Sequence, residues 1–131
     1  MIIRLDLQSE LPIYTQLVHQ IIEGIADGRL APGEPLPSVR SLAADIGINL
    51  HTVNKAYSIL KAEGFIQVHR QKGVVVQPGP MPGLTEEFRS RLKDQLRPLA
   101  AEAVSRGMEE EEFFRLVRET FGALTRNKGE G

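Results

Sequence analysis

The side chains best suited to chemistry in this chain are short polar groups and cations that recur along residues 50–63. In a helix they share the outer face, which carries His51, Thr52, Asn54, Lys55, Ser58 and Lys61. Amide, hydroxyl and imidazole groups can recognise base edges, while ammonium groups hold phosphates. Because any amphipathic helix has a polar outer face, an ordinary solvated surface is an equal alternative for this helix alone.

Two short helices joined by a tight turn would position these side chains. Pro37 and Ser38 signal the start of a helix, with Ser38 as its N-cap, and apolar residues follow at helical spacing until Gly47. Glycine ends a helix because it adopts the left-handed conformation at little cost. Asn49 is the expected cap of a second helix over residues 50–63. The pattern predicts a helix-turn-helix whose second helix can enter a major groove.

A β-hairpin is predicted directly after this motif. Residues 65–69 and 73–77 have the composition of strands, and the turn between them carries Arg70 and Lys72. A hairpin in this place is typical of a wing, whose basic tip can reach a phosphate or a minor groove. An ordinary solvated hairpin turn is the alternative.

Two further segments precede the motif. Residues 2–8 alternate between apolar and polar and predict a short strand or an extended arm. Leu11 and Pro12 begin a core helix that Gly28 ends. The expected fold class is mainly α with a small β-wing (α+β): an N-terminal winged helix-turn-helix followed by a two-helix C-terminal dimerisation element.

Residues 78–83, rich in proline and glycine, are the expected linker between a DNA-binding domain at 1–77 and a helical domain at 84–131. The first of its two amphipathic helices contains Pro98, which should kink it or end its first part, and a frayed tail is expected from Asn127 onward. Two helices this short rarely bury enough surface to be stable alone, so we expect packing against a second copy. The expected dimer interface comprises Leu84, Phe88, Leu92, Leu96, Phe113, Leu116, Val117 and Phe121. The alternative is that the pair folds back on its own winged domain.

Composition and charge exclude several classes of protein. The 131 residues are 41% hydrophobic, enough for a packed core, and the lack of cysteine excludes disulfides and Cys-ligated zinc. With no apolar run of roughly 18 residues and no signal-peptide pattern, the expected location is the cytoplasm, without membrane contact.

The net charge is −1, yet residues 38–75 carry five Lys or Arg against two Asp or Glu, a net of +3. That local excess favours a nucleic-acid partner.

Nothing in the sequence predicts an enzyme. His19, His51 and His69 lie on separate expected elements without metal-ligand spacing. The glycines lack the strand–loop–helix context of a phosphate-binding loop. We therefore expect no catalytic residue, metal or cofactor, and a double-stranded DNA partner. A winged helix that binds another protein is the competing hypothesis, and a small-molecule effector at the dimer groove or between the domains is left open.

Four motifs within residues 9–77 resemble the GntR family of bacterial transcription regulators. They are Pro12-Ile13-Tyr14-x-Gln16-Leu17, Gly28-Arg29-Leu30-Ala31-Pro32-Gly33, Leu36-Pro37-Ser38-Val39-Arg40-x-Leu42-Ala43 and Thr52-Val53-x-x-Ala56-Tyr57-x-x-Leu60-x-x-x-Gly64-Phe65-Ile66. The short C-terminus resembles the YtrA subfamily, in which it is a dimerisation element too small for the ligand pocket of larger members. The resemblance implies a homodimeric repressor on an inverted-repeat operator, often near its own operon, which often encodes an ABC-type transporter.

The resemblance also implies DNA-binding roles for individual residues. The nine candidates are Ser38, Arg40, His51, Thr52, Asn54, Lys55, Arg70, Lys72 and Gly73. Arg40 and Lys72 should mainly hold phosphates, whereas His51 and Asn54 are the expected base readers. The sequence departs from the family pattern where Leu50 replaces a frequent proline, where His51 replaces a frequent asparagine, and at the wing tip, which lacks its first glycine. The first two departures affect which operator is bound, and the third affects the contact of the wing.

Overall fold

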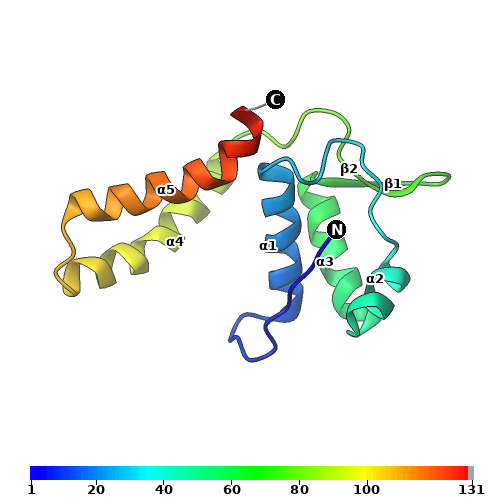
Figure 1. The fold of residues 1–131 in the computed structure, drawn as a ribbon, viewed down its shortest axis with the longest axis horizontal. Helices are drawn as coiled ribbons and strands as arrows, with labels where there is room; N and C mark the ends of the chain where they lie inside the picture. The colour runs from blue at the N-terminus through cyan, green and yellow to red at the C-terminus, as the bar shows by residue number, and fades with distance from the viewer. Residues whose placement is uncertain (130–131) are drawn as a thin grey trace. The chain divides into compact units, whose positions relative to one another are not determined.

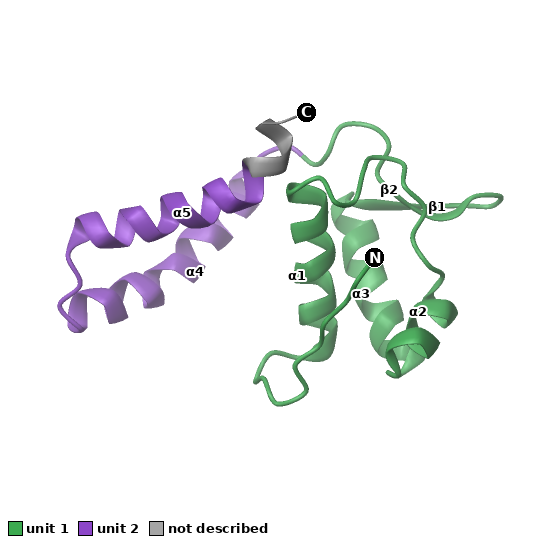
Figure 2. Ribbon diagram, in the orientation of Figure 1, with its two compact units in different colours: residues 1–82 green, residues 83–131 purple. Residues whose placement is uncertain are grey.

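The computed structural model describes the backbone of residues 1–129 and the side chains of residues 1–125 (Figure 1). The chain divides into two compact units, residues 1–82 and the residues from Gly83 onward (Figure 2). The division falls inside the segment 78–83, whose prolines lack the backbone N–H that a continuing strand or helix needs.

The N-terminal unit contains three helices: α1 (Ile13–Ala26), α2 (Val39–Ile46) and α3 (Leu50–Glu63). α3 packs against both α1 and α2. Each helix places an apolar stripe inward because its apolar residues recur every three or four positions. The core comprises Leu17, Ile21, Ile25, Leu30, Leu36, Leu42, Ala43, Val53, Ala56, Tyr57, Leu60, Ile66 and Val76. The predicted mainly α fold with a small wing is confirmed.

The helix-turn-helix is defined by its caps. The Ser38 hydroxyl accepts a hydrogen bond from the backbone N–H of Ser41 at 3.0 Å and so starts α2. The side chain of Asn49 accepts from the backbone N–H of His51 at 2.7 Å and starts α3. Gly47 ends α2 with φ of +71°, a left-handed conformation that side chains with a Cβ rarely adopt. Both predicted caps are confirmed, and they fix where each helix begins.

The wing consists of two antiparallel strands, β1 (Ile66–His69) and β2 (Gly73–Val76). His69 lies opposite Gly73 across a three-residue turn, and Gly73 has φ of +72°. A left-handed residue of this kind commonly closes three-residue hairpin loops. The turn projects beyond the three helices in Figure 1, so its cations reach solvent.

The segment before α2 pairs with β2 through an isolated antiparallel bridge between Pro35 and Val75. The backbone N–H of Leu36 donates to the carbonyl of Val74 at 2.8 Å, and that of Val76 donates to the carbonyl of Glu34 at 2.9 Å. The entry to the helix-turn-helix is therefore hydrogen-bonded to the wing. Sequence analysis did not predict this pairing, because the prolines around the segment suggested only a loop.

Residues 2–6 form an extended arm along α1 and no strand, and residues 7 and 8 of the predicted segment lie in a turn that leads into α1. The backbone N–H of Arg4 donates to Oε1 of Gln20 at 2.9 Å, and that of Asp6 donates to Oε1 of Gln16 at 2.8 Å. Each amide also returns a bond, from Nε2 to the carbonyl of the same arm residue. Gln16 and Gln20 are about one helical turn apart, and Arg4 and Asp6 are two extended residues apart; both separations are about 6 Å. The two glutamine amides can therefore bond to alternate residues of the arm, as the backbone of a neighbouring strand does.

The C-terminal unit is a helical hairpin of α4 (Glu86–Ser105) and α5 (Glu110–Gly129). Thr85 caps α4 by accepting a hydrogen bond from the backbone N–H of Phe88 at 3.0 Å. Among the described residues, no helix is long and apolar enough to cross a membrane.

Two expectations for this hairpin need correction. Pro98 lies inside α4, which continues past it, so of the two expected outcomes, a kink or an end at this proline, the end does not occur. A proline here removes one helical hydrogen bond, to the carbonyl of the exposed Asp94, which water can satisfy. α5 is helical through Asn127 as far as Gly129, and the rest of the expected frayed tail, residues 130 and 131, lies outside the described residues.

Candidate nucleic-acid interface

The first turn of α2 carries two of the predicted DNA-binding residues. Ser38 uses a lone pair of its hydroxyl for the N-cap, which leaves the O–H hydrogen available to a phosphate oxygen. Arg40 is exposed, and its guanidinium makes no hydrogen bond or ion pair within the part of the chain that the structure describes. Arg40 can therefore hold a phosphate without first breaking an internal contact.

The outer face of α3 carries the predicted base readers. His51 and Asn54 are exposed, whereas Thr52 is half-buried and lies at the edge of this face. Asn54 has both an amide donor and a carbonyl acceptor, the pair of groups that recognises adenine in the major groove. Lys55 is exposed too, but its Nζ atom lies 3.9 Å from the ring centroid of Tyr14 on α1.

The wing tip brings together the remaining three candidates. Arg70, Lys72 and Gly73 are all exposed, with the two cations in the turn between β1 and β2. Gly73 supplies the left-handed backbone that this turn requires. A basic tip on a projecting hairpin suits contact with phosphates beside the groove that α3 would enter.

Charge is separated along the N-terminal unit. Residues 1–37 contain two Lys or Arg and five Asp or Glu, a net of −3, whereas residues 38–75 have a net of +3. The helix-turn-helix and the wing are thus the part of this unit that attracts a polyanion, and the arm and α1 are the part that repels one. Among the described residues, no group of three or more His, Asp or Glu is placed to hold a metal ion.

Tyr57 connects the two helices of the motif. Its side chain is only 5% exposed, and its hydroxyl donates to the carbonyl of Pro37 at 2.8 Å. Pro37 directly precedes the cap of α2, so this bond ties the start of α2 to the middle of α3. Burial raises the pKa of Tyr57 from 10.0 to about 12. Burial disfavours the phenolate because a charge in the core loses its hydration.

Tyr57→Phe is expected to lower the free energy of unfolding by about 0.5–1.5 kcal/mol at pH 8, through loss of one buried hydrogen bond. The pKa of Tyr57 is higher in the folded than in the unfolded protein. The stability that the protonated Tyr57 contributes is therefore complete below pH 10 and is lost as the pH rises towards 12. The parent should therefore lose up to about 1 kcal/mol more than the variant between pH 10 and 11. Urea titrations at each pH measure this difference, and parallel curves for the two proteins would contradict it.

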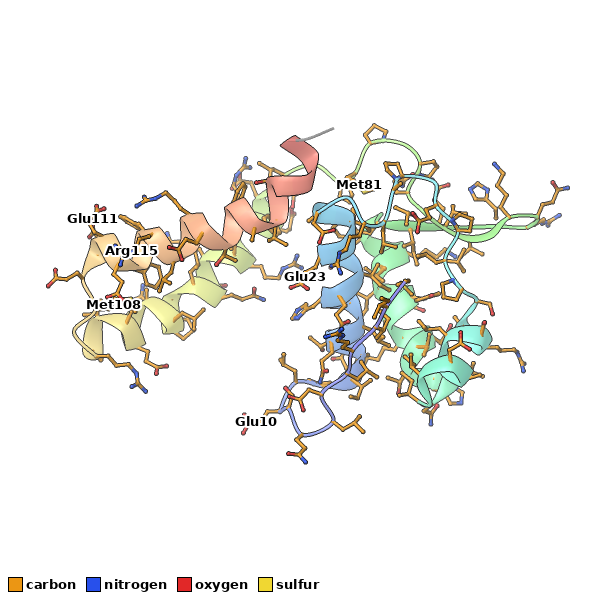
Figure 3. All side chains as sticks on the ribbon, in the orientation of Figure 1. Glu10, Glu23, Met81, Met108, Glu111 and Arg115 are labelled. Carbon is orange, nitrogen blue, oxygen red and sulfur yellow. The ribbon has the colours of Figure 1, made fainter. Side chains whose placement is uncertain are left out.

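The C-terminal hairpin has an apolar groove of about 550 Å³ between its two helices. Five of the predicted dimer-interface residues line it: Leu96, Phe113, Leu116, Val117 and Phe121. Phe88 and Leu92 on α4, and Leu84 in the segment before it, are exposed but lie outside the groove lining. The prediction omitted Leu99, Met108 and Leu124, which also line the groove, and Figure 3 shows Met108 at the turn between α4 and α5.

A short helix pair, a glycine turn and a basic hairpin define the winged helix-turn-helix class, and comparisons with known proteins agree. The model of the bacterial regulatory proteins, gntR family, matches residues 13–76. The HTH-type transcriptional repressor YtrA of Bacillus subtilis (strain 168) is 37% identical over 117 residues, which cover 89% of this chain and 90% of that protein. The chain belongs to the GntR family, and the predicted resemblance to YtrA is confirmed.

Solved structures extend the similarity to the fold. YtrA from Sulfolobus acidocaldarius, a GntR-family transcription factor, has a TM-score of 0.61 and 44% identity over 77% of this chain and 99% of its own. A transcriptional antiterminator from Listeria monocytogenes EGD-e has a TM-score of 0.85 and 28% identity, covering 95% of this chain and 92% of that one. The family and these relatives are transcription regulators and not enzymes, as the sequence predicted.

Two features of the site were missed by sequence analysis. Tyr57 lies on the buried side of α3, and the available signal was that a buried hydroxyl needs a hydrogen-bond partner. Tyr14 is half-buried and packs against the core cluster, and its ring also contacts Lys55, a role that its place in a family motif does not indicate. No local pattern shows that contact, because the two residues belong to different helices.

Proposed function

We propose that this protein is a homodimeric transcriptional repressor that binds an inverted-repeat operator near its own operon. The observation that carries the proposal is the presence, in one chain, of a winged helix-turn-helix and a helical hairpin with an apolar groove between its own two helices. By resemblance the operon would encode a transporter. The protein would act in the cytoplasm, where it meets DNA.

The N-terminal unit, residues 1–82, supports the proposal that the protein recognises duplex DNA specifically. Its exposed face combines amide and imidazole groups on α3 with Arg40, Arg70 and Lys72, whose charged groups make no hydrogen bond or ion pair to the described residues. Phosphate contacts set the position of such a unit on the duplex, and the contacts from α3 to base edges give sequence preference. These groups lie in residues 38–75, the part of the unit with net positive charge. Electrostatic attraction therefore favours an orientation in which α2, α3 and the wing face the DNA.

The C-terminal hairpin supports a dimer. None of the side chains described between residues 83 and 125 is buried, and leucine, phenylalanine and valine line the groove. A two-helix hairpin with no buried side chain has little hydrophobic stabilisation of its own. A second copy supplies a matching apolar surface, and two hairpins related by a two-fold axis would form a four-helix bundle.

Two-fold symmetry predicts the form of the operator. A symmetric dimer presents two identical α3 helices in opposite directions, so the half-sites should be inverted relative to each other. Their centres should lie about 10–10.5 base pairs, or a multiple of that, apart.

Footprinting with the full chain on the region upstream of its own gene tests this proposal. We expect protection of an inverted repeat, with affinity that falls steeply as salt rises from 50 to 200 mM. Sedimentation equilibrium on the same preparation should give twice the mass of one chain. Equal affinity for the upstream region and for random fragments, or protection of a single unrepeated site, would overturn the proposal.

Asn54→Ala is expected to make the free energy of operator binding less favourable by about 1–3 kcal/mol. It should also reduce the preference for one base at one position of each half-site. The reason is that a side-chain amide pairs with adenine through two hydrogen bonds, which alanine cannot make. Competition among operators that differ at single positions measures the preference. Arg40→Ala is the matched control: it should weaken operator and random DNA alike and lower the salt slope by about one phosphate. If Asn54→Ala leaves every position as selective as before, the assignment fails.

A further inference from the structure

Lys55 on α3 is held against an aromatic ring of another helix. Its Nζ atom lies 3.9 Å from the ring centroid of Tyr14, in the first turn of α1. Tyr14 is half-buried and packs against the core cluster, so its ring has a fixed position. Lys55 is exposed, and its side chain has more rotatable bonds than that of Tyr14.

The ring holds the ammonium group without neutralising it. The face of an aromatic ring carries partial negative charge and attracts a cation, but it has no net charge. Within the described residues Lys55 makes no ion pair, so no carboxylate competes for it. An ammonium group has three N–H donors, and one ring face leaves the others available. The full positive charge of Lys55 can therefore act on a ligand.

Lys55 also lies beside the residues predicted to contact bases. It is four residues after His51 and three before Ser58, and these spacings place all three side chains on one strip of a helix. The contact with Tyr14 puts Lys55 on the α1 side of that strip. A lysine in this place borders the groove that α3 would enter, where the phosphate backbone runs.

We propose that Tyr14 is a positioning residue, whose ring holds the Lys55 ammonium in the orientation in which it meets a DNA phosphate. A free lysine side chain samples many rotamers, and fixing it on binding opposes association. A lysine that the ring already restrains loses less conformational entropy when it binds DNA. This inference rests on the proposed DNA-binding function and adds to it a role for α1, on which none of the nine predicted DNA-binding residues lies.

A double-mutant cycle on the full chain tests the proposal. The operator fragment is first identified with the parent protein, so a failure of DNA binding itself is seen before any variant is made. Tyr14→Leu should weaken operator binding about two- to fivefold, the range expected for an exposed cation–π contact. In a Lys55→Ala background the same substitution should have no further effect, because the cation that the ring positions is absent.

Tyr14→Phe is the matched control, because phenylalanine keeps the ring face and loses only the hydroxyl. It should bind like the parent, whereas Lys55→Ala should lower the slope of log affinity against log salt by about 0.9. Equal losses from Tyr14→Leu in both backgrounds would overturn the proposal, as would an equal loss from Tyr14→Phe. A parent salt slope that Lys55→Ala leaves unchanged would overturn the phosphate contact.

A spectroscopic measurement keeps the proposal testable if Tyr14→Leu fails to fold. Protons over the face of an aromatic ring are shifted upfield in NMR spectra. In the free parent protein, the ε-methylene protons of Lys55 should therefore be shifted upfield from those of the other exposed lysines, such as Lys61. Tyr14→Phe should retain this shift. Unshifted protons in the parent would overturn the proposal without any variant.

Discussion

Leu116→Asp is expected to convert the proposed dimer into a monomer and to lower affinity for an inverted-repeat operator by about 10²–10⁴-fold. Leu116 lines the apolar groove of the C-terminal hairpin and is 46% exposed in one copy. A second copy seated in the groove would bury this position. Each dimer would then contain two aspartates in an apolar contact, and an unpaired buried carboxylate costs several kcal/mol.

Affinity is lost because the N-terminal units of two monomers are no longer linked to each other. When one unit of a dimer is bound, the second meets its half-site at an effective concentration of about 1 mM. A monomer has no such advantage and binds each half-site independently. Affinity for a single half-site should therefore be unchanged, because α2, α3 and the wing keep their residues.

Val104→Asp is the matched control for this experiment. Val104 is on α4 of the same hairpin and is 76% exposed, but it does not line the groove. It introduces the same charge and should leave both mass and operator affinity at the parent values. Sedimentation equilibrium and fluorescence anisotropy with full and half operators measure the two effects. A Leu116→Asp protein that remains dimeric would show that the groove is not the dimer contact.

Local features of this fold could be predicted from the sequence because short-range sterics determine them. Ser38 and Asn49 cap the helices they were expected to cap, since a short polar side chain satisfies free N–H groups wherever a helix starts. Gly47 ends α2 for an equally local reason. These positions fix the bounds of α2 and the start of α3, and thereby the faces that Arg40 and Asn54 occupy.

Contacts between distant segments could not be predicted. The arm is bonded to Gln16 and Gln20 through side-chain amides, and neither residue carries a sequence signal for this role. The contact of Tyr14 with Lys55 joins residues 41 positions apart in the numbering, and it depends on the packing of α1 against α3. Such contacts follow from tertiary packing, which periodicity alone does not specify.

Leu60→Ala is expected to lower the free energy of unfolding of the N-terminal unit by about 2–5 kcal/mol. Leu60 is on the inner face of α3, is fully buried, and belongs to the core cluster that joins α1, α2 and the wing. Removal of its branched end loses hydrophobic stabilisation and leaves a cavity, because the surrounding helices relax only partly. Domains of this size have a total stability of about 5–15 kcal/mol, so the loss is a large fraction of it.

Val68→Ala provides the control for side-chain size. Val68 is on β1 and is 57% exposed, so its truncation removes little buried surface and should change stability by less than about 0.5 kcal/mol. Urea denaturation followed by circular dichroism measures both variants. A loss below 1 kcal/mol for Leu60→Ala would mean that the core beneath α3 is loosely packed.

DNA binding by the Leu60→Ala protein separates stability from recognition. Leu60 is buried on the inner face of α3, whereas Asn54 is exposed, so Leu60 contributes no group to the exposed face. At a temperature where the variant is fully folded, its operator affinity should therefore equal that of the parent. Near its unfolding midpoint, the apparent affinity should fall only in proportion to the folded fraction, because unfolded chains do not present the reading face. A reduced affinity in the fully folded variant would show that core packing also sets the geometry of α3 against the groove.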